Sequence, residues 1–404
     1  MSDYIPMEIV SQILLRLPPK VAVSMTTVCK EWYALITNPS FVHEYLLHHS
    51  NPQLLLLLRR ISNHPNPPNR IVPLYSDLSP GNPNPNPNPP FSNLVSACNG
   101  LLCFRHTHQR ILCNPAVRRF ITLPRVSERQ PLDPAVVTCV RSNLRLSGHR
   151  NPRMYDFYYL FFDSSNCDSK LIRLAWFHEN RIGGKNAQIF HWVEVYSVAT
   201  GVWRYIPPFS LFFELASGVS FTDTDRAISH WLAYRKERDR LYFILSFDFH
   251  SETFAEIPLP LTLAQFPHNS ILMSVVEGSP LSVCCRSGLD FHTCDIWEMR
   301  EYGHPESWTL AHTFNFPHID LDPAVFPMPL AIQYMYVVRI KNTDDAAFLL
   351  FFNGVCVYRL DVGTLTLTQL QIGVAVQPRR WRLLNSYYSE SLALFDKENG
   401  FDIY

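Results

Sequence analysis

The chain has 404 residues, and its 47% hydrophobic, 13% aromatic and only 17% charged residues are typical of two or three folded domains with many half-buried strands. Its 35 basic and 35 acidic residues cancel, which excludes strong attraction to nucleic acid or to an anionic membrane. The sequence has neither the roughly 18-residue apolar run that spans a bilayer nor a secretory signal in residues 1–7, so we expect an intracellular protein, cytoplasmic and/or nuclear.

The first predicted element is a short amphipathic helix over residues 6–17. Apolar side chains recur there at helical spacing, Pro6 suits a first-turn position and Pro18-Pro19 ends the run. A second periodic stretch over residues 21–36 ends at the turn signal Asn38-Pro39. A helical unit of about 40 residues buries too little surface to be stable alone, so its apolar face predicts docking on a partner or on the rest of the chain.

An Asn- and Pro-rich segment occupies residues 62–90 and ends in the Asn-Pro repeats of residues 82–89. Proline lacks the backbone N–H that helices and sheet ladders need, so this composition predicts a solvated loop. Strand-like apolar stretches at residues 54–58 and 71–75 flank its two halves, which places the loop inside the second domain. We therefore expect a helical domain at residues 1–48 and a β-rich domain at residues 53–404 that folds without the helices.

The ten cysteines are neither dense nor regularly spaced, so we expect buried, reduced thiols and no disulfide framework. Cys98, Cys103 and Cys113, with His106 and His108 between them, carry N and S ligands, but their spacing matches no standard zinc finger. Their apolar, strand-like context favours small hydrophobic residues instead. The sequence predicts no metal site and no cofactor.

A strand-turn-strand pattern then recurs five times, in residues 111–124, 193–207, 244–258, 296–314 and 355–372. An aromatic residue follows the turn in four of the units, namely Phe120, Trp203, Phe254 and Trp308. The later intervals are about 50 residues, which is the period of a four-stranded propeller blade. We therefore predict an all-β domain of about six blades. Residues 392–395 and 401–404 are expected to complete a sheet with residues 54–58 and 71–75.

Several motifs in order resemble known families. Residues 5–41 resemble the F-box through IPMEIV at 5–10, ILLRLP at 13–18, VCKEW at 28–32, LI at 35–36 and PSF at 39–41. The rest resembles the plant F-box-associated domain through CNGLLC at 98–103, LCNP at 112–115, LP at 123–124 and VEVY at 193–196. Later matches are FDF at 247–249, EIPLP at 256–260, IW at 296–297, EYG at 301–303 and ESW at 306–308.

The resemblance implies a small all-α F-box module followed by an all-β, kelch-like propeller. It also implies that the F-box binds a Skp-family adaptor and, through it, cullin and RING subunits, while the β domain binds an unidentified substrate protein. The chain would then be the substrate-recognition subunit of an SCF-type ubiquitin ligase, with no bond chemistry and no catalytic residue of its own.

A pair of helices can recognise a partner helix by inserting apolar side chains, with an aromatic residue as the anchor. The predicted adaptor-binding residues are therefore Pro6, Ile9, Ile13, Leu14, Leu17, Val28 and Trp32. The alternative for each residue is a place in the core of the helical module, because one helical face serves both uses. The sequence does not identify the residues that bind the substrate.

Two other functions stay open at this point: a non-degradative scaffold that uses the same two modules, and a propeller enzyme with an incidental helical leader. The sequence contains no Gly-x-Ser-x-Gly elbow, no His-Glu-x-x-His helix and no Gly-rich phosphate loop. Arg379, Arg380, Trp381 and Arg382 bring cations and an aromatic ring together, but we interpret them as a solvated strand end.

Overall fold

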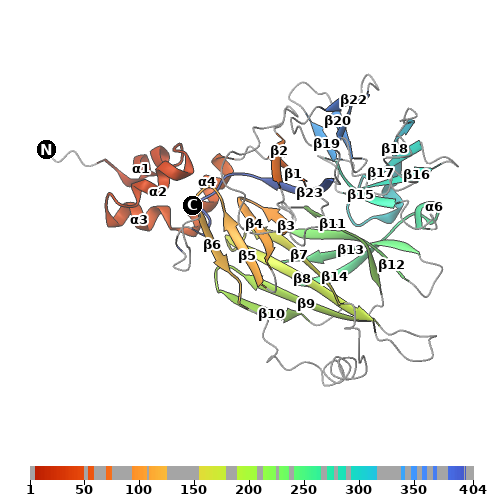
Figure 1. The fold of residues 1–404 in the computed structure, drawn as a ribbon, viewed down its shortest axis with the longest axis horizontal. Coiled ribbons are helices and arrows are strands. Elements are labelled where there is room, and N and C mark those ends of the chain that lie inside the picture. The colour runs from red at the N-terminus through yellow and green to blue at the C-terminus, as the bar shows by residue number, and fades with distance from the viewer. Residues whose placement is uncertain are drawn as a thin grey trace. The chain divides into compact units, whose positions relative to one another are not determined.

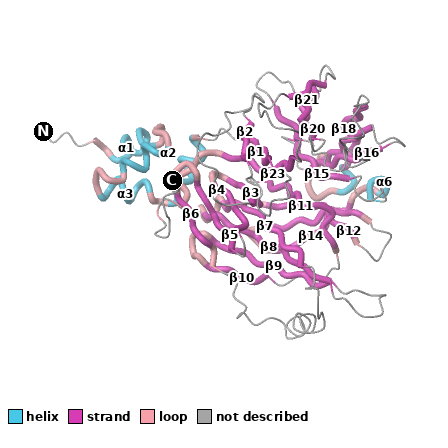
Figure 2. Tube along the Cα trace, viewed as in Figure 1, coloured by secondary structure: helices cyan, strands magenta, loops and turns pink. Residues whose placement is uncertain are grey.

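The computed structural model describes residues 5–49, 53–58, 70–74, 93–106, 109–124, 154–178, 189–206, 213–223, 227–235, 241–264, 271–276, 281–287, 293–315, 338–341, 347–352, 357–361, 367–370, 381–394 and 396. The chain forms two compact units. The first contains residues 1–54, 85–208 and 386–404, and the second contains residues 55–84 and 209–385. Figures 1 and 2 show helices at the N-terminal end and strands through most of the remaining described chain.

Four short helices open the chain: α1 (Met7–Leu14), α2 (Pro19–Met25), α3 (Lys30–Ile36) and α4 (Pro39–His48). Proline at the first position starts α2 and α4 without loss of a helical hydrogen bond. The side chain of Asn38 caps α4 by accepting a 2.8 Å hydrogen bond from the Ser40 N–H. The first helix is shorter than predicted, because residues 15–17 continue it only as a tight turn.

Two four-stranded antiparallel sheets follow in the first unit. The first sheet consists of β3 (Asn93–Cys98), β4 (Leu101–His106), β5 (Gln109–Asn114) and β6 (Arg119–Thr122). The second consists of β7 (Met154–Asp163), β8 (Asp168–His178), β9 (Ile189–Ser197) and β10 (Val202–Ile206). Apolar side chains of both sheets share one core, which includes Leu101, Leu112, Tyr158, Leu171 and Trp203.

The second unit repeats this arrangement. One four-stranded sheet consists of β11 (Glu214–Asp223), β12 (Ile228–Tyr234), β13 (Tyr242–Asp248) and β14 (Thr253–Pro258), followed by the single-turn helix α6 (Leu261–Ala264). An eight-stranded sheet follows, made of β15 (Ile271–Val276), β16 (Leu281–Ser287), β17 (Thr293–Met299), β18 (Trp308–Asn315), β19 (Val338–Lys341), β20 (Ala347–Phe352), β21 (Val357–Asp361) and β22 (Leu367–Leu370). The 3-10 helix η1 (Pro305–Ser307) precedes β18.

The eight-stranded sheet is two antiparallel meanders joined by one short parallel pairing, between β15 and β19 at Val275 and Val338. The described strands therefore contain five four-stranded meanders. A sixth sheet has the order β2-β1-β23 and joins β1 (Gln53–Leu58) and β2 (Arg70–Leu74) to β23 (Trp381–Tyr388). These six sheet units are those predicted for a propeller of about six blades.

The sixth sheet corrects one sequence prediction. Residues 54–58 and 71–74 do lie in strands, β1 and β2, but the C-terminal strand that joins their sheet is β23, which pairs with β1 while β2 pairs with the other edge of β1. Residues 392–394 lie outside any strand, and the side chains of Leu392 and Leu394 enter hydrophobic cores instead. Residues 401–404, and the predicted loop at residues 62–90 apart from β2, fall outside the described residues.

The five recurring units of the sequence are confirmed as the third and fourth strands of the five meanders. Phe120, Trp203 and Phe254 occupy matching positions in the second residue pair from the turn, opposite Cys113, Tyr196 and Phe247, whereas Trp308 pairs with Met299 in the first pair of its ladder. Each tryptophan also bonds to the preceding meander. Trp203 Nε1 donates to the Pro124 carbonyl at 3.0 Å, and Trp308 Nε1 donates to the Pro258 carbonyl at 3.2 Å.

Candidate functional site on the helical module

Helix α1 carries two apolar stripes on different faces. Val10 and Leu14 face inward and are buried, with Leu14 0% exposed. Ile9 and Ile13 are 51% and 49% exposed, and their spacing of four residues places them on one face of the helix, while Ile5, which is 56% exposed, precedes the helix and its N-cap Pro6. A helix that only packed on its own domain would need the first stripe alone, so the second stripe is surplus apolar surface.

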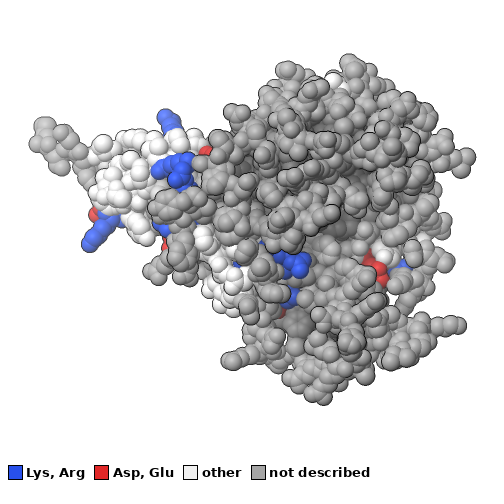
Figure 3. All heavy atoms as spheres, in the orientation of Figure 1, with Lys and Arg blue, Asp and Glu red and all other residues white. Residues whose placement is uncertain are grey.

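Exposed apolar side chains are concentrated in this module. Among the described residues, seven of the ten large hydrophobic side chains that are exposed lie between residues 5 and 47. Besides Ile5, Ile9 and Ile13 they are Val21, Val28, Tyr33 and Leu47. Figure 3 shows only scattered charged side chains on the visible surface of the helices. We call Ile5, Ile9, Ile13, Val21, Val28 and Tyr33 the exposed apolar set.

The core beneath this set is complete without it. Leu14, Ile36, Phe41 and Tyr45 are buried in one cluster. The Tyr45 hydroxyl donates a hydrogen bond to the Leu17 carbonyl, and burial together with the nearby charge of Glu390 raises the pKa of Tyr45 well above its ordinary value. His49 Nε2 lies 2.7 Å from the Leu15 carbonyl. The exposed apolar set thus adds surface for association rather than support for the module's own packing.

The structure divides the predicted adaptor-binding residues into three groups. Pro6, Ile9, Ile13 and Val28 are exposed. Leu17 and Trp32 are half-buried and pack against the core of the module. Leu14 belongs to that core, so its side chain cannot contact a partner while the module is folded. Adaptor binding by the other six residues stays a prediction.

Sequence reasoning missed three members of the exposed apolar set: Ile5, Val21 and Tyr33. Ile5 lies before the N-cap Pro6 and outside α1, so helical periodicity gives no signal for its exposure. Val21 and Tyr33 carried no such signal, since their exposure depends on how α2 and α3 pack against the other helices. This packing is a tertiary property that short periodic runs do not define.

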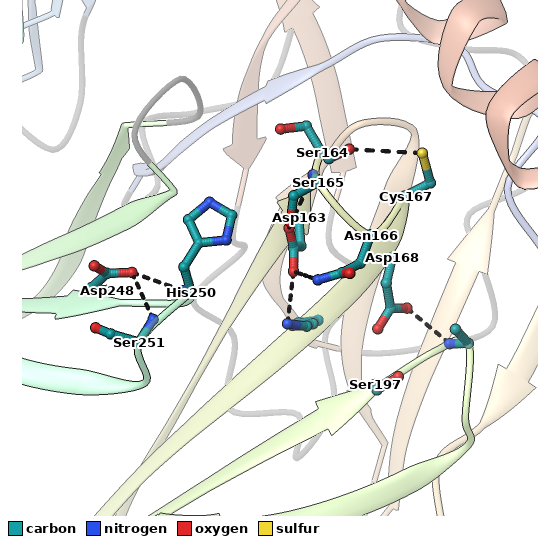
Figure 4. A network of polar contacts seen from close by, with 12 residues as sticks. Asp163, Ser164, Ser165, Asn166, Cys167, Asp168, Ser197, Asp248, His250 and Ser251 are labelled. Carbon is teal, nitrogen blue, oxygen red and sulfur yellow. Dashed lines mark hydrogen bonds and ion pairs between the residues drawn. The ribbon is translucent and has the colours of Figure 1, made fainter.

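Polar clusters in the tight turns of the sheets have structural roles. In the β7–β8 turn, Asp163 accepts hydrogen bonds from Ser165 Oγ at 2.6 Å, Asn166 Nδ2 at 2.8 Å and Lys170 Nζ at 2.8 Å (Figure 4). Burial alone would raise the pKa of Asp163, but these hydrogen bonds and the Lys170 charge hold it well below its usual range. Asp163 therefore stays ionised as the centre of the turn. The carboxylate of Asp168 accepts from the Ala199 N–H at 2.8 Å.

An aspartate, a histidine and a serine also lie close together in the β13–β14 turn, as Figure 4 shows. Their geometry is that of a turn cap. Asp248 Oδ1 accepts from the backbone N–H groups of His250 at 2.7 Å and Ser251 at 3.2 Å. A catalytic relay would instead need the carboxylate to orient the imidazole ring and the ring to contact the serine hydroxyl. These bonds join the Asp248 carboxylate to the backbone, as in an Asx turn.

Of the cysteines that resemble metal ligands, Cys103 and Cys113 are buried and Cys98 is half-buried. Burial raises the pKa values of Cys98, Cys103 and Cys113 to about 12, and for Cys103 the nearby charge of Arg110 only partly offsets this effect. A zinc ligand must be a thiolate, so this environment disfavours metal binding. Within the described part of the chain, no group of His, Cys, Asp and Glu side chains is arranged to hold a metal ion. None of the described helices is long and apolar enough to cross a membrane.

Comparison with known proteins matches both parts of the chain. A family model described as an F-box associated beta propeller domain matches residues 74–393, which is well over half of the chain, and an F-box-like model matches residues 3–48. A putative F-box/kelch-repeat protein of Arabidopsis thaliana is 26% identical over 329 residues, covering 78% of this chain and 77% of that protein. The F-box protein CPR1 of Arabidopsis thaliana is 24% identical over 326 residues, covering 78% of this chain and 73% of CPR1. The chain therefore belongs to the family of F-box proteins in which the F-box is followed by an F-box-associated β-propeller domain.

Proposed function

We propose that this chain is the substrate-recognition subunit of an SCF-type ubiquitin ligase, acting in the cytoplasm or the nucleus. The exposed apolar set binds a Skp-family adaptor, and the adaptor brings cullin and RING subunits. The β domain binds the target protein. The chain itself carries out no bond chemistry and positions one protein next to the ubiquitin-transfer machinery.

The observation that carries this proposal is the second apolar stripe of α1. Ile9 and Ile13, four residues apart on α1 and each about half exposed, form an apolar ridge for a partner helix or groove, and the exposed Ile5 precedes the same helix. Each side chain would lose its remaining exposed surface on binding, and burying apolar area stabilises an interface by roughly 25 cal/mol per Å². The family match to an F-box over residues 3–48 indicates which kind of partner to expect.

A non-degradative scaffold would use the same helices, and it differs only in what the adaptor carries. If the chain is a ligase receptor, cullin and RING subunits co-purify through the adaptor, and the purified assembly transfers ubiquitin to a bound protein. A scaffold would retain the adaptor and lack the transfer. The enzyme alternative has no support from the turn at Asp248 and His250, where the hydrogen bonds serve the backbone.

The test is adaptor co-purification with the double variant Ile9→Ala/Ile13→Ala of the full chain. We expect loss of the adaptor, because each truncation removes apolar surface from one of the two half-exposed isoleucines of α1. The matched control is Val202→Ala, which truncates an exposed apolar side chain on β10 and should leave adaptor binding unchanged. Wild-type binding by the double variant would refute the assignment of this surface.

A further inference from the structure

The segment that follows β23 is buried although it belongs to no helix or strand. Over residues 389–394, the side chains of Ser389, Ser391, Leu392 and Leu394 are all buried. A buried irregular segment needs partners for its backbone carbonyls, because an unpaired carbonyl away from water destabilises the fold. The groups that pair with these backbone carbonyls indicate the structural role of the segment.

Asn114, at the end of β5, supplies the partners. Its side chain is fully buried, and Nδ2 donates to the Ser391 carbonyl at 3.0 Å and to the Ala393 carbonyl at 2.8 Å. The Ser391 hydroxyl lies 3.2 Å from the same nitrogen. Asn114 Oδ1 accepts from the Ala116 N–H at 3.0 Å, which fixes the orientation of the amide. An amide fits here because it donates on one side and accepts on the other.

Gly100 provides the space for the segment. It lies in the β3–β4 turn with φ of +81°, and a Cβ atom there would lie 2.1 Å from Ser391 Oγ, 2.7 Å from Ser391 Cβ and 2.9 Å from the Ser389 carbonyl oxygen. Any side chain at this position would therefore collide with the segment. Gly100 and Asn114 come from the CNGLLC and LCNP motifs, so two separate motifs of the sequence meet on one short stretch of chain.

The two leucines of the segment enter different cores. Leu392 packs with Leu14, Ile36, Phe41 and Tyr45 of the helices, together with Val117 from the β5–β6 turn. Leu394, two residues later, packs in the core shared by the first two sheets. The segment thus has one apolar side chain in the helical module and one in the β domain.

We propose that residues 389–394 act as a tie that holds the helical module in a fixed orientation on the first sheets, and that Asn114 and Gly100 are the positioning residues for this tie. The tie itself is independent of the proposed function. The effect of the tie on ligase activity does rest on the proposed function. An adaptor bound to helices that the tie holds in place would present the ubiquitin-transfer machinery to the β domain from one direction.

The test measures the orientation directly in the full chain. Spin labels are introduced through non-natural amino acids at Lys20 on α2 and Val202 on β10, which are both exposed, and the distance distribution between them is recorded. Wild-type protein should give one narrow peak. Asn114→Asp keeps the shape but turns the donor into a carboxylate facing two carbonyls, so the narrow peak should be lost. Asn38→Asp makes the same chemical change at an exposed helix cap, where aspartate accepts equally well, and should keep the peak.

A second pair of variants distinguishes loss of the fixed orientation from unfolding of the protein. Gly100→Ala should also broaden the distribution, and adding Ser391→Gly should narrow it in part, because the second change removes the two atoms closest to the new Cβ but leaves the Ser389 carbonyl oxygen and the positive φ. If Asn114→Asp fails to fold, Leu392→Ala decides the matter, since it removes only the side chain that enters the helical core. Narrow wild-type distributions for folded Asn114→Asp, or for Gly100→Ala and Leu392→Ala, would overturn the proposal.

Adaptor co-purification separates this proposal from the proposed function. Asn114→Asp should still bind the adaptor, because the exposed apolar set is untouched, whereas Ile9→Ala/Ile13→Ala should lose the adaptor and keep the narrow peak. Loss of the narrow peak without loss of adaptor supports the tie. A narrow peak in Asn114→Asp, combined with adaptor loss in Ile9→Ala/Ile13→Ala, would refute the tie and support the proposed receptor function.

Discussion

Ile13 and Leu14 are adjacent in the sequence, and the structure predicts opposite consequences for their truncation. Leu14 is fully buried in the core of the helical module, whereas Ile13 is 49% exposed on the other face of α1. Leu14→Ala would leave a cavity and should lower the free energy of unfolding by about 2–5 kcal/mol. Ile13→Ala should cost well under half of that, because its outer half has no neighbours to lose in the free protein.

Adaptor affinity should show the reverse order. Truncation of an apolar side chain at the centre of an interface typically costs about 1–2 kcal/mol, so Ile13→Ala should weaken adaptor binding roughly tenfold. Folded Leu14→Ala should bind nearly as well as wild type, since its side chain does not reach the surface. Denaturant unfolding of the full chain gives the first quantity, and calorimetric titration with purified adaptor gives the second. If Ile13→Ala destabilised the fold as much as Leu14→Ala, the two-stripe description of α1 would be wrong.

Three further predictions concern the β domain. Trp308→Phe removes the donor that bonds to the Pro258 carbonyl and should lower the free energy of unfolding by about 1 kcal/mol, measured by thermal or chemical denaturation. Asp163 has a depressed pKa in the folded state, so its contribution is present above the unfolded pKa of about 3.9 and is lost as pH falls below it. Asp163→Asn should therefore destabilise the protein at pH 7, and this difference should shrink toward pH 2; a pH-independent difference would contradict the argument. Cys103 and Cys113, with pKa values of about 12, should react with iodoacetamide only after denaturation, as followed by mass spectrometry.

The repeat of the β domain was predictable because its signals are local. Phe120, Trp203 and Phe254 each follow a four-residue turn, and a turn of defined length sets the register of the two strands that it joins, whereas Trp308 follows a longer connection that contains η1. The sequence therefore identified the outer pair of strands in all five meanders. It could not identify which strand closes the sixth sheet, because that pairing joins residues more than 300 positions apart.

The candidate site was predictable as a set and not residue by residue. Helix α1 has apolar side chains on two faces, so periodicity alone cannot say which face is covered by Phe41 and Tyr45. Leu14 is for this reason predicted as an adaptor-binding residue with the core as its alternative, and the structure places it in the core. Leu392 and Leu394 are predicted as part of a strand because they are spaced as apolar residues in a strand are. The same spacing also fits the observed segment, in which the two leucines enter different hydrophobic cores.

The sheet β2-β1-β23 has a consequence for synthesis of the protein. Strand β1 has the sequence QLLLLL, and β23 pairs with it only after residues 381–388 have been made. At roughly 5–20 residues per second, the ribosome needs about 16–65 s to reach that point after completing β1. Throughout that interval a leucine-rich edge offers unpaired backbone groups to any neighbouring chain. We therefore expect the earliest strand of the nascent protein to be a site of aggregation until its last described strand emerges.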